Sequence, residues 1–373
     1  MRTRNSRTAA ALVATSTAVA VVLTPGLAQA TSDVTTVASG LDNPRGLGFA
    51  PDGSLYVAEA GRGGDDPCFT GPEGDEVCFG TTGAITKIRG GTQSRVLSGL
   101  PSIAGGDGSF AVGPSDVAFQ GVGGMYFTVG LGADPAEREG LPEAGQEGSG
   151  WLLRGKAARG SWKQAADIAG FEAQANPDGG EHDSNPNSVA ATHGGRAVAD
   201  AGGNSLVWVA ANREVSTLAV FPAQQADAPP FLGLPPGTQI PMESVPTSVV
   251  RGPDGAFYVG ELTGFPFEPD SARVFRVVPG QDPQVFADGF TNIMDIGFAA
   301  DGTLYVLEIA QNGLLSGDPT GALVRLAPDG SQTVVMSDGL FLPGGLALRG
   351  GAAYVSNCGV CVGDGSVLRI PLT

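Results

Sequence analysis

Histidine is almost missing from this sequence: His182 and His193 are the only two among 373 residues. No Gly-x-Ser-x-Gly, His-Glu-x-x-His or Walker segment occurs either, which speaks against a Ser-His-Asp hydrolase, a zinc protease or a P-loop enzyme. His193 precedes a Gly-Gly turn and is expected to be a solvated turn residue. His182 could act as a general base oriented by Asp183, but a polar capping loop is the preferred interpretation.

Basic residues are also scarce, with 21 Lys and Arg against 38 Asp and Glu and a formal charge of -17. A surface field of this sign repels phosphate backbones and anionic lipid, so nucleic-acid binding is excluded. Charged residues make up 16% and hydrophobic residues 42% of the chain. This composition is too apolar for a disordered chain and supports a packed core.

Turn-forming residues are abundant instead, with 59 Gly and 27 Pro, about twice the usual share. Both residue types disfavour helix interiors, so long helices are not expected. The composition therefore favours short strands joined by tight turns.

The first thirty residues differ from the rest and predict a secretory signal peptide over 1–30. Three arginines precede an apolar stretch, Ala9 to Leu23, and a small-x-small cleavage pattern ends at Ala30. The stretch is shorter than the roughly 20 residues of a membrane span, so no span is expected in the mature protein. Removal of the three arginines changes the formal charge from -17 to -20. We expect a secreted, extracellular monomer.

A segment of two short apolar runs recurs six times in the mature chain. The runs are joined by an Asp-Gly or Gly-Gly turn, which is typical of a β-hairpin. A third and usually a fourth alternating run follow in each copy, as in Gly321 to Leu326 and Thr333 to Met336. Four antiparallel strands per copy predict an all-β, six-bladed β-propeller over residues 31–373. The copies begin at Pro44, Pro114, Pro186, Pro246, Ile293 and Pro343.

The two ends of the chain are predicted to share the last blade. The sixth copy stops after its third strand, whereas an unpaired run, Val34 to Val37, precedes the first copy. Pairing of this run with Val367 to Ile370 would supply the missing strand and remove two exposed sheet edges. An open sandwich would not explain the mismatch.

The long connections are predicted to lie on one face of the propeller. They follow the second or fourth strand of a copy, whereas the other turns are short. Long loops on a rigid scaffold are where function usually lies, so we expect the site on this face. The connections span 61–82, 130–149, 172–184, 222–244, 262–271 and 309–320.

Acidic residues recur at two aligned positions of the copies, at the end of the second strand and near the start of the first. Convergence of such carboxylates at the channel mouth would favour a hard cation, so Ca²⁺ is the predicted metal. Each acid could instead accept backbone N–H groups from its own loop or pair with an arginine such as Arg45. The predicted metal ligands are Glu59, Asp116, Asp200, Glu261, Asp295 and Glu308, and the further candidate ligand-binding residues are Asn204, Asn357, His182 and Asp183.

The four cysteines are predicted to form disulfides, because an exported protein meets an oxidising compartment. The preferred pairing is Cys68 with Cys78 and Cys358 with Cys361, each within one loop. A pair of bridges between the two loops and a zinc site of four thiolates are the alternatives.

Several segments resemble the ScyD/ScyE family, over nearly the whole mature chain. The resemblance implies a secreted six-bladed propeller but does not fix a reaction. The most specific segments are Gly260-Glu-Leu-Thr-Gly-Phe-Pro-Phe267 and Ser356-Asn-Cys-Gly-Val-Cys361, with Asn43-Pro-Arg-Gly-Leu47, Asp183-Ser-Asn-Pro186, Asp200-Ala-Gly-Gly-Asn204 and Leu307-Glu-Ile-Ala310 in support.

The architecture more distantly resembles NHL-repeat and gluconolactonase-type propellers, the latter implying metal-dependent lactone hydrolysis at the channel mouth. Comparable residue types here are Glu59, Asp200, Asn204, Glu261 and Asn357. Two function classes therefore stay open. The favoured one is a binding scaffold for a small molecule, glycan or protein; the alternative is a Ca²⁺-dependent, lactonase-like hydrolase.

Overall fold

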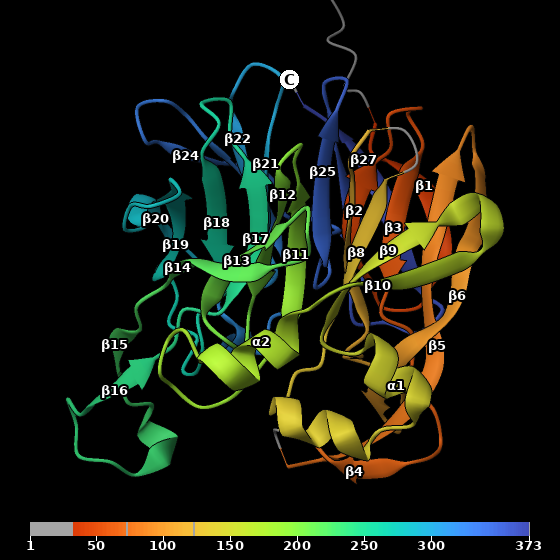
Figure 1. Cartoon of the computed structure of the whole chain (residues 1–373). Helices are drawn as coiled ribbons and strands as arrows, with labels where there is room; N and C mark the ends of the chain where they lie inside the picture. Colours follow the sequence, from red (N-terminus) through yellow and green to blue (C-terminus); the bar gives the residue numbers. More distant parts are fainter. Residues whose placement is uncertain (1–32, 72–73, 122–123, 373) are drawn as a thin grey trace, which may run out of the picture. The chain divides into compact units, whose positions relative to one another are not determined.

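Six antiparallel sheets, five of four strands and one of five, surround a central axis in the computed structural model, which describes residues 33–71, 74–121 and 124–372 (Figure 1). The predicted six-bladed propeller is confirmed. The chain from Asp33 onward forms one compact unit, and the predicted signal peptide at 1–30 lies outside the described residues.

The blades follow one another along the chain, each running from the innermost strand outward. Blade 1 comprises β2 (Pro44–Phe49), β3 (Leu55–Glu59), β5 (Glu76–Arg89) and β6 (Thr92–Gly105), with the short β4 (Cys68–Thr70) beside β5. Blade 2 comprises β7 (Pro114–Phe119), β8 (Met125–Val129), β9 (Trp151–Lys156) and β10 (Ser161–Asp167). Blade 3 comprises β11 (Pro186–Ala191), β12 (Gly195–Asp200), β13 (Ser205–Ala210) and β14 (Val215–Val220).

The second half repeats the pattern. Blade 4 comprises β17 (Pro246–Arg251), β18 (Phe257–Glu261), β19 (Ala272–Val277) and β20 (Gln284–Phe290). Blade 5 comprises β21 (Ile293–Phe298), β22 (Leu304–Glu308), β23 (Ala322–Leu326) and β24 (Gln332–Met336). Blade 6 comprises β25 (Gly345–Arg349), β26 (Ala352–Asn357), β27 (Gly365–Pro371) and β1 (Thr35–Leu41).

The N-terminal strand completes blade 6, as the sequence predicts. β1 pairs antiparallel with β27, placing Thr36 opposite Leu368 and Ser39 opposite Ser366. Ala38 and Leu41 of β1 are buried. The ring is therefore closed by hydrogen bonds between the two ends of the described chain.

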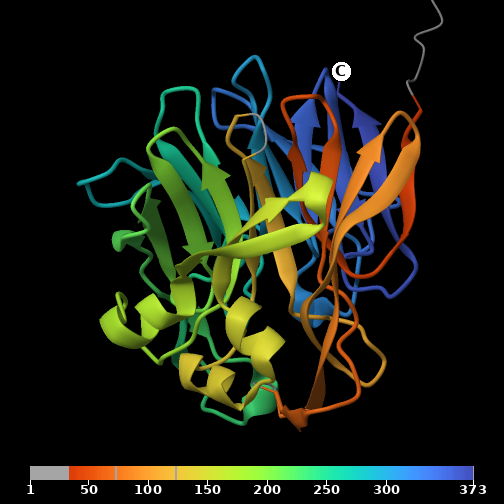
Figure 2. The ribbon, with the colours of Figure 1, turned by 45° about the vertical axis from the view of Figure 1, so that its right-hand side comes forward.

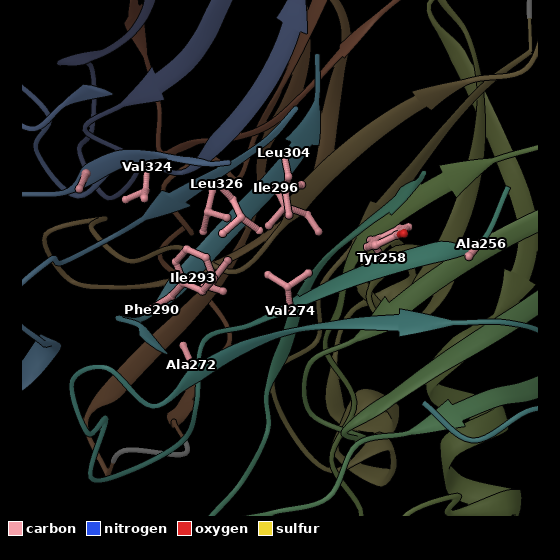
Figure 3. Packing of buried hydrophobic residues seen from close by; sticks show 12 residues of the cluster. Ala256, Tyr258, Ala272, Val274, Phe290, Ile293, Ile296, Leu304, Val324 and Leu326 are labelled. Atoms are coloured by element: carbon pink, nitrogen blue, oxygen red, sulfur yellow. The ribbon is translucent and has the colours of Figure 1, made fainter. Parts of the chain in front are cut away.

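Most of the hydrophobic core lies in one cluster at each of the six blade interfaces, and smaller clusters lie toward the long-loop face. The cluster between blades 4 and 5 joins Val274 and Phe290 to Ile296, Leu304 and Val324, all buried (Figure 3). Because each blade buries both of its faces, the middle strands read as nearly continuous apolar runs. The cores hold neighbouring blades together while leaving the axis to polar residues.

The two faces of the propeller differ in their connections, as predicted. Tight turns at one end contain Gly53, Gly255 and Gly302, whose φ angles of 85°, 83° and 87° are those that glycine tolerates best. The other end carries the elaborations α1 (Glu143–Gly148), α2 (Ile168–Ala175), β4 and the hairpin of β15 (Gln224–Asp227) and β16 (Gln239–Met242) (Figures 1 and 2). Short 3-10 turns span Pro135–Gly140, Ala157–Arg159, Pro230–Leu232 and Leu314–Ser316.

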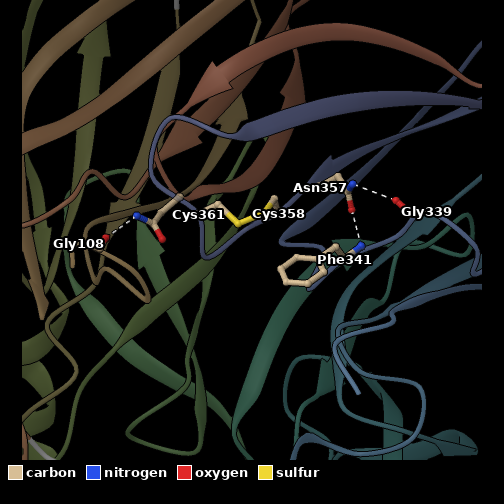
Figure 4. Close-up of a disulfide and its surroundings, with 7 residues drawn as sticks. Gly108, Gly339, Phe341, Asn357, Cys358 and Cys361 are labelled. Carbon is tan, nitrogen blue, oxygen red and sulfur yellow. Dashed lines mark hydrogen bonds between the residues drawn. A yellow bond between two sulfur atoms is a disulfide. The ribbon is translucent and has the colours of Figure 1, made fainter. Parts of the chain in front are cut away.

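Both predicted disulfides are present, Cys68 with Cys78 and Cys358 with Cys361. Each closes a single connection, and Figure 4 shows the second next to Asn357. No helix within the described ranges is long and apolar enough to cross a membrane.

Candidate functional site

A cavity of about 1440 Å³ opens at the channel mouth on the long-loop face. We call it the mouth cavity. Residues from all six blades line it, and most of its wall is apolar. The wall includes Ala60, Ile103, Val112, Leu131, Val245, Leu262, Met294, Ile309, Leu314 and Val360.

The polar floor of the mouth cavity comes from one aligned position of the innermost strands. Arg45, Ser115, Asn187 and Thr247 occupy this position in blades 1 to 4 and line the cavity. Ser115 Oγ donates to Asn187 Oδ1 at 2.7 Å, and Asn187 Nδ2 donates to the Thr247 carbonyl at 2.6 Å. Thr247 Oγ1 continues the chain to the Ile293 carbonyl at 2.7 Å. These bonds link blades 2 to 5 and fix the floor.

Arg45 is the one positive charge among these floor residues and has no acidic partner. Its Nη2 donates to the Ala111 carbonyl at 2.9 Å, and no carboxylate of the described chain lies within 4.0 Å. Burial lowers the pKa of Arg45 to about 10, so the guanidinium is still charged at pH 7. An uncompensated cation that lines a cavity attracts an anionic group.

A second polar layer lies one residue further along the innermost strands. Asp116 Oδ2 accepts bonds from Ser188 Oγ at 2.8 Å and the Val189 N–H at 2.9 Å. Asp295 Oδ2 accepts the Leu346 N–H at 2.7 Å. Each carboxylate thereby bridges to the next blade, satisfying an N–H group that no sheet partner reaches.

Asp116 and Asp295 are nevertheless poorly solvated. Burial raises the pKa of Asp116 to about 6. Burial, together with the charge of Asp116, raises the pKa of Asp295 well above its usual range. The negative charge of Asp116 therefore acts on Asp295 across the axis. The hydrogen bonds that both acids accept come from residues of the blades themselves.

Glu59 and Glu261, at the ends of β3 and β18, are each paired with an arginine. Arg95 Nη2 lies 2.6 Å from Glu59 Oε2, and Arg273 binds Glu261 through Nε and Nη2. Both glutamates are fully buried. The sequence left open a pairing with an arginine such as Arg45; the partners are Arg95 and Arg273.

Asp200 and Glu308, at the equivalent ends of β12 and β22, have no cationic partner in the part of the chain that the structure describes. Asp200 accepts Ser184 Oγ at 2.7 Å and the Asn185 N–H at 2.6 Å, while Glu308 accepts the Thr291 N–H at 2.8 Å. Burial raises the pKa of Asp200 to about 6 and that of Glu308 to about 7. Both side chains hold the connection that enters their own blade.

An acidic cluster around Glu172 lies in the same loops. Glu172 of α2 is 1% exposed, and its Oε1 has no hydrogen-bond partner among the described residues. Burial, and then the charges of Asp200, Asp178 and Asp183, raise the pKa of Glu172 to about 8. Asp183 Oδ1 is also buried without a partner, and burial raises the Asp183 pKa. We call these four residues the Glu172 cluster.

The remaining candidate residues have separate places. Asn204 accepts the Val245 N–H at 3.0 Å and donates to Asp178 Oδ2 at 3.0 Å, next to the Glu172 cluster. Asn357 accepts the Phe341 N–H at 2.7 Å and donates to the Gly339 carbonyl at 3.0 Å (Figure 4). His182 is exposed and is not part of the mouth-cavity lining.

The structure thus divides the six predicted metal ligands among scaffold roles, although the charge of Asp116 acts on Asp295. Asp200 lies near Asp183 and the Glu172 cluster near Asn204, two residues that were predicted to bind a ligand and not the metal. Within the described ranges, no three His, Cys, Asp or Glu side chains are grouped so that they could hold a metal ion. The calcium assignment stays a prediction.

Sequence reasoning missed two features. Arg45 lies one residue before the aligned position that was chosen, so the repeat alignment contained the signal for it. Glu172 begins the long connection 172–184, which was expected on the functional face, but it matches no repeated position and was not among the candidate site residues.

The Glu172 cluster predicts that stability falls as pH rises. A carboxyl whose folded pKa is raised binds more protons in the folded state, so its stabilising effect is lost between about pH 4.5 and 8. Glu172→Gln should raise Tm at pH 8, by roughly 2–4 °C for each kcal/mol of stability that removal of the buried charge restores. It should also flatten the plot of Tm against pH. Calorimetry from pH 5 to 8.5 measures this. Glu181→Gln, an exposed change in the same loop, should leave the plot of Tm against pH as it is in the wild type. Equal slopes in the wild type and in both variants would show that Glu172 does not cause the pH dependence.

Comparison with known structures supports the fold. A gluconolactonase from Xanthomonas campestris matches with a TM-score of 0.55 and 10% identity, over 91% of this chain and 89% of that one. A putative gluconolactonase matches with a TM-score of 0.52 and 11% identity, over 92% and 95%. A protein of unknown function from Bacteroides thetaiotaomicron matches with a TM-score of 0.53 and 11% identity, over 91% and 75%.

The sequence itself matches no family model and no curated protein. The chain is a six-bladed β-propeller that resembles gluconolactonase-type propellers in fold. At 10–11% identity this likeness concerns architecture alone.

Proposed function

We propose that this chain is a secreted, monomeric binding protein of the ScyD/ScyE type that holds a small molecule in the mouth cavity. The observation that carries the proposal is Arg45, a cation on the floor of the cavity that has no acidic partner among the described residues. The ligand has a carboxylate or another anionic oxygen group that meets Arg45 and an apolar body that meets the wall.

The wall supports the apolar part of this description. Phe110, 65% exposed, and Leu315, 52% exposed, line the mouth cavity and offer uncovered apolar surface to a ligand. The cavity is larger than the roughly 300–1000 Å³ of drug-sized sites, which suits a ligand with several rings or chains. Acidic groups lie among the lining residues at Asp75, Glu76, Asp107 and Glu137. These carboxylates would repel the anionic group of the ligand from other parts of the cavity, and so favour a ligand orientation in which that group meets Arg45.

Arg45→Gln should weaken binding of an apolar anion by about 10- to 100-fold, because a charged hydrogen bond contributes roughly 1.5–3 kcal/mol. The probe pair is 1-naphthoate and the neutral 1-naphthalenemethanol, measured by calorimetric titration. The naphthoate should bind the wild type more tightly than the alcohol, and the Arg45→Gln protein should no longer distinguish them.

The matched control is Arg62→Gln, which removes the same charge from an exposed residue outside the cavity lining. It should change neither affinity by more than about twofold. Equal affinity of the wild type for both compounds, or equal losses in the two variants, would refute the role of Arg45.

Calcium-dependent lactone hydrolysis is the second candidate, favoured by the gluconolactonases among the structural matches and by the partnerless oxygen of Glu172. The residues fit a channel-mouth metal poorly, because Glu59 and Glu261 are already neutralised by arginines. We therefore derive no hydrolytic step through a metal. Metal analysis of the mature protein, with a gluconolactone hydrolysis assay with and without added Ca²⁺, separates an enzyme from a binding protein.

A further inference from the structure

A second cavity lies on the opposite, tight-turn face, between blades 2 and 3. It has a volume of about 300 Å³ and is lined by cationic side chains from both blades. We call it the basic pocket. Its Lys and Arg residues are Arg154, Lys163, Arg196 and Arg213, and His193 also lines it.

The fold assembles these residues from separate parts of the chain. Arg154 on β9 is paired in register with Lys163 on β10, at the outer side of blade 2. Arg196 lies on β12, and His193 precedes that strand in its tight turn. Arg213 comes from the turn between β13 and β14. The pocket therefore depends on the packing of one blade against the next.

Two of the guanidinium groups share one aromatic ring. The Arg196 guanidinium lies 3.9 Å from the centroid of Tyr126, and that of Arg154 lies 5.7 Å from the same centroid. Arg196 also donates to Gln120 Oε1 at 2.6 Å and to the Tyr126 hydroxyl. These contacts hold the two like charges in place on one ring.

No acid compensates this concentration of charge. No Asp or Glu lines the basic pocket, and none of its Lys or Arg side chains forms an ion pair within the described ranges. Glu214, next to Arg213 in sequence, accepts a bond from Asn212 and is not part of the lining. In a chain with 38 acidic and 21 basic residues, a pocket lined by four Lys and Arg side chains and by no described carboxylate is unexpected.

Unused donors remain inside the pocket wall. The Nε atoms of Arg154 and Arg196 are both buried without a hydrogen-bond partner among the described residues. A buried N–H group of a charged side chain is costly when unpaired. An anion with several acceptor oxygens, bound by the side-chain ends that line the pocket, would offset the repulsion between the cations.

We propose that the basic pocket binds a tetrahedral oxyanion, phosphate or sulfate, either free or as the monoester of a small molecule. The donors available around it are guanidinium, ammonium, imidazole and amide groups, which match such an anion on several sides. The volume is sufficient for the anion with ordered waters or for a small ester. This site is independent of the mouth cavity, so it stands even if the proposed function fails.

Titration calorimetry of the mature protein with sodium phosphate and with sodium sulfate tests the proposal, at an ionic strength kept constant with NaCl. Saturable one-site binding is expected with both anions. Glucose 6-phosphate, with glucose as its neutral partner, distinguishes the source: tighter binding than phosphate identifies a monoester ligand, and equal or weaker binding identifies the free anion.

Arg154→Gln and Lys163→Gln should each weaken phosphate binding by about tenfold or more. The matched control is Arg251→Gln, an exposed arginine in the equivalent turn region of blade 4, which should change affinity by less than twofold. Lys163 is exposed, so its variant keeps the fold even if Arg154→Gln does not. Heats equal to those of NaCl dilution, or equal losses in Lys163→Gln and Arg251→Gln, would overturn the proposal.

Discussion

Deletion of residues 31–41 is expected to prevent the propeller from folding to its native stability. The deletion removes β1, and with it the buried side chains of Ala38 and Leu41 that pack with Leu47 and Val367 between blades 6 and 1. Burial of one aliphatic side chain contributes roughly 1.5–3 kcal/mol, and total stabilities are about 5–15 kcal/mol. The edge of β27 would also be left open to aggregation. Thermal unfolding and size-exclusion chromatography measure the loss.

The control for this deletion is removal of residues 31–34 alone, which leaves β1 intact. Val34 is 42% exposed, so its loss should leave Tm within about a degree of the wild type. A protein lacking 31–41 that melted at the wild-type temperature would show that the ring does not need its closing strand.

Arg273→Met is expected to lower the free energy of unfolding by about 3–5 kcal/mol at pH 7, because it leaves the buried carboxylate of Glu261 without its cation. Burial already raises the pKa of Glu261, and loss of Arg273 would raise it further. Protonation removes the unpaired charge, so the destabilisation should shrink as pH falls toward 5. Urea unfolding at pH 7 and pH 5 provides the comparison.

Arg276→Met is the matched control, on the same strand β19. Its ion pair with Asp254 is partly exposed, at 33% and 37%, and exposed pairs are screened by water and salt. It should therefore cost much less than Arg273→Met at either pH. Adding Glu261→Gln to Arg273→Met should recover most of the lost stability. A double variant as unstable as the single one would show that the cost comes from packing of the arginine stem and not from the charge.

Much of the architecture follows from local sequence. Asp-Gly turns, such as the one containing Gly302, set where a hairpin reverses, and alternation of apolar residues sets which side chains are buried. Closure by the N-terminal strand then follows from the repeats. The sixth copy ends after its third strand, and one unpaired run precedes the first copy. The two disulfides could also be predicted from local sequence, because each joins cysteines only 10 or 3 residues apart.

The repeat alignment also predicted acids at the strand ends, but it did not predict which residues pair with them. Arg95 reaches Glu59 from the outermost strand of blade 1, 36 residues along the chain. Arg273 reaches Glu261 from a different strand of its own blade. Which arginine neutralises which carboxylate depends on side-chain direction and on loop paths, and the period of the repeat carries no information on either.

Only the tertiary structure decided which charges are left without a partner. Arg45 lines the mouth cavity and donates to the Ala111 carbonyl, and no carboxylate of the described residues lies within 4.0 Å of it. The basic pocket exists because blade 2 and blade 3 pack with their cations facing one cavity. A sequence pattern records the local period of each blade, whereas the electrostatic balance of a site depends on contacts between residues far apart in the chain.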